Sequence, residues 1–180
     1  AVRVPVVAAG GIADARTVAA ARALGAAGVQ AGTAYLLCPE STISAIHRAA
    51  LKHPAAHTAL TNVFSGRPAR GIVNRVMREL GPMSPAAPAF PLATSAIAPL
   101  RAKAEAQGSG DFSPLWCGQN PGACRELPAA QVTGGLVAAG SLPPQAYPDS
   151  SSGVLWTLYT KFATLRVCPV RRHPPNVPVA

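Results

Sequence analysis

The sequence is poor in aromatic and acidic residues, and these shortages narrow the possible functions. Phe, Trp and Tyr make up 5% of the 180 residues, and seven acidic residues stand against 16 basic ones, for a net charge of +9. A basic excess can serve nucleic acid or an acidic membrane surface. Here the basic residues are scattered and no nucleic-acid motif is present, so we expect no nucleic-acid partner. No run of about 20 uncharged apolar residues exists either, so we expect no membrane span.

Cysteine and histidine patterns give no metal site. The four cysteines form no C-x-x-C pair; they are Cys38, Cys117, Cys124 and Cys168. The spacing of Cys117 and Cys124 is not that of a zinc knuckle, so we interpret all four as isolated reduced thiols of a cytoplasmic protein. His53 and His57 have helical spacing and His47 lies six residues before His53, but Pro54 breaks any helix between His53 and His57. We interpret these histidines as ordinary surface residues.

The first apolar segment predicts a strand followed by a helix. Val4 to Ala9 is short and rich in β-branched residues, which suits a strand buried on both faces. Asp14 stands where a helix N-cap is wanted, because its carboxylate can accept first-turn N–H groups. The next ten residues, Ala15 to Leu24, are almost all strong helix formers, and Gly25 follows as a C-cap. The pattern predicts a strand near 4–9 and a helix at about 14–24.

A second apolar run completes a βαβ unit. Val29 to Leu37 follows Gly28, and we expect a strand near 28–33. Strand, turn, helix and strand within about 30 residues predict parallel pairing of the two strands. Glycines follow or end both strands, at Gly10-Gly11 and at Gly32-Thr33. Without a Cβ in the way, backbone N–H groups at such turns can approach an anion, and the Thr33 hydroxyl adds a donor.

Two neighbouring strand ends with N–H donors describe the phosphate site of a flavin-binding (β/α)₈ barrel. Spacing alone leaves a second interpretation open, a pair of glycine turns in any α/β protein. The residues themselves are more specific. AAGGI at 8–12, followed nineteen residues after Gly11 by QAGT at 30–33, closely resembles the nitronate monooxygenase family, once called 2-nitropropane dioxygenases.

This resemblance implies an FMN enzyme with a TIM-barrel fold. It also implies that the flavin phosphate is held by the second Gly of the first motif and by the Q-x-G-T segment. Those roles are carried over to Gly11, Gln30, Ala31, Gly32 and Thr33. The family usually has Met or Ile at the position of Ala31 and often a basic residue at that of Ala34. A backbone contact survives the first change, and the second removes a charge near the site.

Two later segments strengthen the resemblance. FSGRPARGI at 64–72 is similar to the start of the family's smaller C-terminal domain. Arg67 or Arg70 can meet an anion there, or the arginines can bind backbone carbonyls in a structural turn, which we favour. LWCGQ at 115–119 is similar to the family's L-W-A-G-Q segment. Trp116 and Gln119 can lie against the flavin or substrate cavity, or form a core Trp with a turn Gln.

The rest of the chain is predicted to be mainly helical from 42 to 138. Ser41 or Thr42 should cap a helix that Pro54 stops, and Pro128 suits the first turn of a final helix through about Ala138. We also expect helices over residues 71–80 and 100–107, separated by a Pro-rich irregular loop over 82–99. From Ser141 the resemblance stops. We expect residues 141–180 to be poorly ordered, apart from a short helix or strand near 154–166.

The predicted fold class is α/β: the C-terminal portion of a TIM (β/α)₈ barrel, with its last two strands and helices, plus a mainly helical C-terminal region. Residues 1–53 form the barrel part, 54–140 the smaller helical and loop region, and 141–180 an unassigned tail. A complete barrel needs about 200 residues or more. Because the chain starts with Ala1 just before the first strand, we interpret it as a fragment entered before the seventh barrel strand.

The function implied by the resemblance is oxidation of alkyl nitronates with O₂ by an FMN-dependent nitronate monooxygenase, of which this chain supplies the phosphate site. The family's catalytic His lies on an earlier barrel loop, and none of the four histidines matches it: His47, His53, His57 and His173. We therefore assign no catalytic residue and expect the isolated chain to be inactive. The alternatives are a flavin-dependent enoyl-reductase-type barrel and a non-catalytic remnant.

Overall fold

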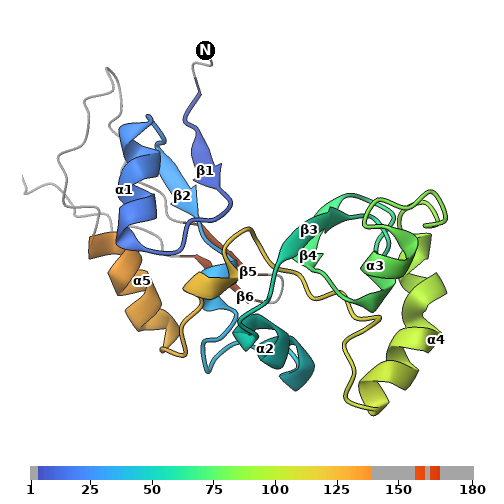
Figure 1. The fold of residues 1–180 in the computed structure, drawn as a ribbon. Helices are drawn as coiled ribbons and strands as arrows, with labels where there is room; N and C mark the ends of the chain where they lie inside the picture. Colours follow the sequence, from blue (N-terminus) through green and yellow to red (C-terminus); the bar gives the residue numbers. More distant parts are fainter. Residues whose placement is uncertain (1–3, 139–156, 161–162, 167–180) are drawn as a thin grey trace, which may run out of the picture.

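The computed structural model describes residues 4–138, 157–160 and 163–166. Its elements form two groups, which Figure 1 shows. A βαβ unit lies with the last helix of the 4–138 segment, α5, and a β-hairpin lies with helices α3 and α4. Helix α2 lies between the two groups. The fold has mixed α and β content, as the sequence predicts.

The βαβ unit consists of β1 (Val7–Ala9), α1 (Ala15–Ala23) and β2 (Gly28–Gln30). The two strands are parallel and pair from Val7 with Gly28 to Ala9 with Gln30, which confirms the predicted crossover. Asp14 is the N-cap of α1, as expected. Gly25 follows the C-cap with φ +93°, a backbone conformation that glycine adopts without strain.

Two expectations about these strands are wrong. β2 ends at Gln30 rather than near residue 33, because the chain turns into the short 3-10 helix η1 (Thr33–Tyr35), which places Tyr35 in the core. The first strand is not buried on both faces. Val4, Val6 and Val7 are 68%, 48% and 54% exposed. β1 pairs with β2 alone among the strands that the structure describes, so its other edge and much of its surface lack a protein neighbour.

Helix α2 (Ala45–Lys52) begins later than expected. Ser44, not Ser41 or Thr42, is its N-cap, and the Ser44 side chain accepts the N–H of His47. The helix ends before Pro54, as predicted. Arg48 explains the late start, because its guanidinium donates to the carbonyls of residues 37, 38 and 41 at 2.8–3.0 Å. These bonds hold the preceding segment as a loop folded against the helix.

The predicted mostly helical region contains a β-hairpin instead. β3 (Thr58–Thr61) pairs antiparallel with β4 (Ala69–Ile72). α3 (Arg75–Leu80) is therefore shorter than the helix expected from residue 71. The A-R-G-I segment joins β3 because their backbone groups satisfy each other across the pair. At the intervening turn Gly66 has φ +83° and packs against the backbone of Phe90, where a Cβ has no room.

The Pro-rich segment is also more ordered than expected. α4 (Leu92–Ala106) begins inside the predicted loop and contains Pro99. Its first residues, L-A-T-S-A-I-A, are mostly good helix formers, and one interior proline does not end the helix. The 3-10 helix η2 (Pro121–Ala123) precedes α5 (Ala129–Val137), whose start after Pro128 confirms the prediction.

Part of the predicted tail is described by its backbone. β5 (Thr157–Thr160) and β6 (Ala163–Arg166) form an antiparallel pair, which agrees with the strand expected near 154–166. The expectation of poor order over the other residues of 141–180 lies outside the described residues.

Three buried clusters hold the described elements together. The first joins the βαβ unit to α5 and includes Val18, Val29, Tyr35 and Leu136. The Tyr35 hydroxyl also bonds that of Thr133 on α5 at 3.0 Å. The second lies under α2, and the third lies between the hairpin, α3 and Trp116. Because α5 packs on the βαβ unit, segments distant in sequence contribute to one core.

Asn74 offers a test of how the segment after α4 is held. Its buried side-chain amide donates to the carbonyl of Gly110 at 2.8 Å and to that of Ser113 at 3.0 Å. We predict that Asn74→Ala lowers the free energy of unfolding by about 2–4 kcal/mol, because two carbonyls lose their donor. Urea denaturation measures this change. The exposed Asn120 is the matched control: Asn120→Ala should change stability by less than about 0.5 kcal/mol, and equal effects of both would contradict the assignment.

Candidate functional site: two glycine turns beside a C-terminal loop

The parallel pairing of β1 and β2 brings the two predicted phosphate turns together. The strands run in the same direction and their last paired residues are Ala9 and Gln30. The Gly10-Gly11 turn and the Ala31–Thr33 segment therefore leave the pair at the same edge. Ligands of parallel α/β structures bind at the carboxyl ends of strands, which is where these turns lie.

The Gly11 turn is open toward its surroundings. Gly10 and Gly11 have φ +96° and +72°, so their backbone conformation favours glycine. A Cβ added to Gly11 meets one atom within 4 Å, the Gln119 Oε1 at 4.0 Å, and a Cβ on Gly10 meets none. The backbone N–H groups of Gly11, Gly32 and Thr33 donate to no acceptor within the described chain. These free donors fit an anionic group such as a phosphate.

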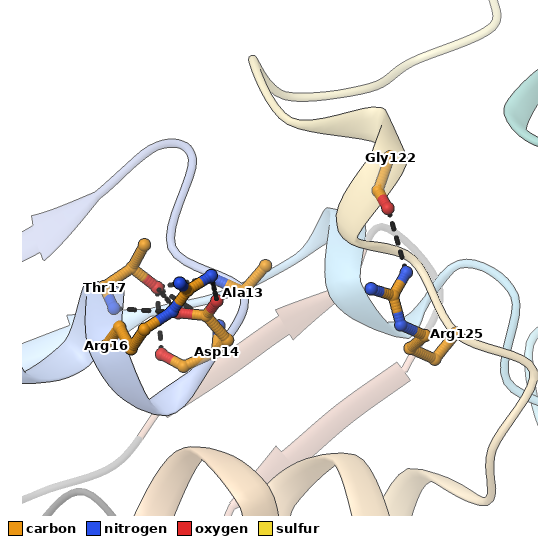
Figure 2. A network of polar contacts seen from close by, with 6 residues as sticks. All are labelled: Ala13, Asp14, Arg16, Thr17, Gly122 and Arg125. Carbon is orange, nitrogen blue, oxygen red and sulfur yellow. Dashed lines mark hydrogen bonds and ion pairs between the residues drawn. The ribbon is translucent and has the colours of Figure 1, made fainter. Parts of the chain in front are cut away.

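The N-terminus of α1 is partly satisfied by its own side chains (Figure 2). The Asp14 carboxylate accepts the Thr17 N–H at 2.8 Å, and the Thr17 hydroxyl accepts the N–H groups of Ala13 and Asp14 at 3.1 Å. The backbone hydrogen bond from Thr17 is the main cause that lowers the pKa of Asp14. A charged carboxylate therefore lies at this helix end, where it opposes the approach of an anion.

Two residues of a later segment, Gly118 and Cys124, hold Thr33 in place. Its Oγ1 accepts the backbone N–H of Gly118 at 2.7 Å, and its carbonyl accepts the Cys124 thiol at 3.1 Å. The Thr33 hydroxyl also hydrogen-bonds the Cys117 sulfur, an interaction that acts to lower the pKa of that thiol. Sequence reasoning missed Gly118 and Cys124 as contacts of this turn. The L-W-C-G-Q motif marked the segment, but nothing in the sequence says that it reaches Thr33.

The other predicted site residues contribute backbone rather than charge. Gln30 ends β2 and is half-buried, while the Ala31 side chain is buried at 4% exposure. Ala31 can thus reach a ligand only through its backbone. Ala34 is also buried, so the position where the resemblance implies a basic residue faces the core. These residues and the Gly11 turn lie at the same end of the strand pair and carry no charged side chain, and their role in binding a phosphate stays a prediction.

Comparison with known proteins identifies the group to which this architecture belongs. The family model for nitronate monooxygenase matches residues 1–138. The nitronate monooxygenase of Pseudomonas aeruginosa is 50% identical over 135 residues, which is 74% of this chain and 38% of that protein. A probable nitronate monooxygenase of Bacillus subtilis is 43% identical over 120 residues, 66% of this chain and 35% of that protein.

The chain belongs to the nitronate monooxygenase family.

Solved structures agree. Nitroalkane oxidase from Streptomyces ansochromogenes superimposes with a TM-score of 0.69 at 45% identity, over 77% of this chain and 40% of that one. FabK from Thermotoga maritima superimposes with a TM-score of 0.58 at 29% identity, over 77% of this chain and 44% of that one. The chain thus spans about two fifths of the length of these relatives.

The arginines of the family-like FSGRPARGI segment make structural contacts. Arg70 Nη1 donates to the Thr58 carbonyl at 3.2 Å and to its hydroxyl at 3.3 Å, which ties the two hairpin strands together. The Arg67 guanidinium lies over the Phe90 ring, 4.3 Å from its centroid. This is the structural arrangement that we favoured for the segment.

Trp116 belongs to the hydrophobic core. Its ring meets that of Phe64 edge to face, with centroids 5.7 Å apart, and it packs against the third buried cluster. Of the two expectations for the L-W-C-G-Q segment, the structure supports a core Trp. Gln119 differs, because it is exposed and lies beside Gly11.

The described cysteines are buried and unreactive, and two of the described histidines lie at the surface. Cys38, Cys117 and Cys124 are buried free thiols, and burial raises the pKa of Cys117 to about 11 and that of Cys124 to about 12. Thiols with such values carry almost no thiolate near neutral pH. His53 and His57 are exposed, as expected. Among the residues that the structure describes, no group of three or more metal-ligating side chains occurs.

Within the described residues, no helix is both long and apolar enough to cross a membrane.

His47, on α2, is buried, so the expectation that it is a surface histidine is wrong, and its burial links stability to pH. This burial lowers the pKa of the imidazole below its usual value. In the unfolded chain a histidine takes up its proton near pH 6.5, while the folded chain resists it. The stabilising effect of the neutral ring is therefore fully present above about pH 6.5 and is lost as the pH falls below that value.

We predict that the free energy of unfolding decreases between pH 7 and pH 5, with a slope of up to about 1.4 kcal/mol per pH unit from this group. His47→Gln should flatten this slope, because the titrating ring is gone. Urea denaturation at several pH values measures it. His53→Gln, at an exposed position, should leave the slope unchanged, and an equally steep slope in His47→Gln would refute the assignment.

Proposed function

We propose that the chain is the C-terminal part of an FMN-dependent nitronate monooxygenase and supplies the FMN phosphate site. In this proposal residues 1–53 are the last part of a TIM barrel and 54–140 a smaller C-terminal region. The observation that carries the proposal is the pair of turns after β1 and β2. They leave two parallel strands at one edge and present N–H groups that have no acceptor in the described chain.

FMN, when bound, supplies the redox chemistry by which an alkyl nitronate is oxidised with O₂. The residues of this chain bind and orient. Gly11, Gly32 and Thr33 donate N–H groups to the phosphate, and the Thr33 hydroxyl donates a further hydrogen bond. Gln30 and Ala31 lead the chain from β2 into this set of donors, the proposed phosphate cradle. Because these donors are neutral, affinity for the phosphate depends on hydrogen-bond geometry rather than on ion pairing.

No residue of this chain is proposed as the catalytic base. His47 is buried on α2, and His53 and His57 are exposed beyond the end of that helix. His173 lies outside the described residues. The family's base is expected on a segment that this sequence does not contain.

A flavin-dependent enoyl-reductase-type barrel is the second candidate. The structural similarity to FabK is the observation that supports it. An assay with NADH and an enoyl thioester separates the two activities. The higher identity to nitronate monooxygenases favours the first. A non-catalytic remnant remains the third candidate, and the flavin absorption spectrum of the purified protein distinguishes it from a flavoprotein.

The phosphate cradle predicts which amides respond to FMN. In two-dimensional NMR spectra of the chain, FMN should shift the amide signals of Gly11, Gly32 and Thr33, because phosphate oxygens replace water at these N–H groups. Gly11→Val and Gly32→Val should abolish binding, since a side chain occupies the phosphate position. Thr33→Val should weaken it by about 1–3 kcal/mol. Unchanged affinity in both glycine variants would refute the site.

We also predict that the 180-residue chain alone consumes no oxygen with ethyl nitronate or propionate 3-nitronate, even with added FMN. It lacks the histidine expected to act as base, and the exposed edge of β1 leaves the barrel-type unit incomplete. An oxygen electrode measures the rate, with an FMN-only blank as the control. Turnover above that blank by monomeric protein would show that the base lies within this chain.

A further inference from the structure

Gln119, the last residue of the L-W-C-G-Q segment, lies beside the Gly10-Gly11 turn. Its side chain is exposed, and the carboxamide makes no hydrogen bond with any described residue. Yet its Oε1 lies 4.0 Å from the place where a Gly11 Cβ would be, so the amide lies beside the open side of the Gly10-Gly11 turn. A polar group without a protein partner is thus placed next to N–H groups that also lack one.

The backbone around Gln119 is fixed from several sides. The N–H of Cys117 donates to the Arg70 carbonyl on β4 at 3.2 Å. The N–H of Gly118 donates to Thr33 Oγ1 at 2.7 Å, and the Cys124 thiol donates to the Thr33 carbonyl. Gln119 therefore follows directly after two residues whose backbones are anchored, one to the hairpin and one to the cradle. The backbone position from which the Gln119 side chain extends is thus fixed beside Thr33 and the Gly11 turn.

The hydrogen bond from the Gly118 N–H also limits what the Thr33 hydroxyl can do, because it occupies one acceptor position of the Thr33 Oγ1. Because Thr33 Oγ1 accepts the Gly118 N–H, the remaining capacity that matters for an anion is its own O–H donor. The absence of a side chain at Gly118 permits this contact, since a Cβ there would lie only 3.1 Å from Thr33 Oγ1. The same short segment thus directs one donor, Thr33, and carries another, Gln119.

We propose that Gln119 is a further ligand of the phosphate group and that Gly118 is a positioning residue for the Thr33 hydroxyl. The inference rests on the proposed phosphate site. The ligand class is a phosphate monoester. The Gln119 carboxamide donates an N–H to a phosphate oxygen on the side of the Gly11 turn, after a rotation that exchanges its amide oxygen and nitrogen. The proposed phosphate site then contains donors from the βαβ unit and from the later segment that carries Gln119.

The experiment compares three ligands on the 180-residue chain: FMN, riboflavin and inorganic phosphate. Dissociation constants are obtained from NMR or calorimetric titrations. Gln119→Leu keeps a similar size without the donor and should weaken FMN binding about 5- to 30-fold. Riboflavin, which lacks the phosphate, should bind wild type and variant within about twofold. Inorganic phosphate should follow FMN, and if only FMN is affected the contact is to another part of the cofactor, which overturns the assignment to phosphate.

Two further variants sharpen the result. Gln119→Glu places a carboxylate beside the phosphate, so it should weaken FMN binding more than Gln119→Leu and more strongly at low salt. Gln131→Leu is the matched control, because Gln131 is an exposed glutamine on α5. It should leave all three affinities unchanged. An equal loss in Gln131→Leu and Gln119→Leu would overturn the proposal.

A double-mutant cycle tests the positioning role. Gly118→Ala should weaken FMN binding about 3- to 10-fold when Thr33 is present, because the new methyl group displaces its hydroxyl. In a Thr33→Val background the same change should have less than a twofold effect. Additive effects would mean that Gly118 acts on folding or on the loop alone, and would overturn this part of the inference.

The outcomes separate this inference from the proposed function. If Gly11→Val abolishes FMN binding while Gln119→Leu leaves it intact, the phosphate site stands and Gln119 is not its ligand. If the wild-type chain binds neither FMN nor phosphate, the site itself is wrong and Gln119 is wrong with it.

Discussion

The hydrogen bonds at Thr33 are the contacts on which the candidate site depends. Thr33 begins η1 directly after the second strand, and it accepts a backbone N–H from Gly118 and a thiol from Cys124. These bonds join segments 85 and 91 residues apart. Without them the cradle would consist of two turns at the end of a two-stranded sheet, with the Thr33 hydroxyl free to point elsewhere.

The same arrangement explains why the site needs no charged side chain. The Asp14 carboxylate already caps the N-terminus of α1, and its negative charge would oppose an anion at that point. Ala34 lies in the core, and Arg67 and Arg70 are engaged by Phe90 and Thr58. The proposed phosphate site therefore relies on neutral donors, whose backbone positions are set by the parallel strand pairing and the Thr33 contacts.

The apolar surface of β1 shows the opposite situation. Val4, Val6 and Val7 have the composition of a buried strand but remain about half exposed or more. Burial of such side chains is worth about 1.5–3 kcal/mol each when a neighbour covers them. The residues that the structure describes do not provide that neighbour. The apolar composition of a strand thus predicts that it can be buried, while its observed burial depends on which elements pack beside it.

The βαβ unit, its helix cap at Asp14, the parallel strands and the family were predictable from the sequence, because these follow from local periodicity, capping chemistry and short motifs. The predicted cradle residues Gly11 and Gly32-Thr33 do lie at one strand edge, although their binding role stays a prediction. Only the tertiary structure decided that Ala69–Ile72 pairs as a strand, that α4 begins at Leu92 and continues through Pro99, and that Gly118 and Cys124 reach Thr33. Strand pairing and loop docking depend on partners far away in the chain, and no local propensity encodes which partner will be there.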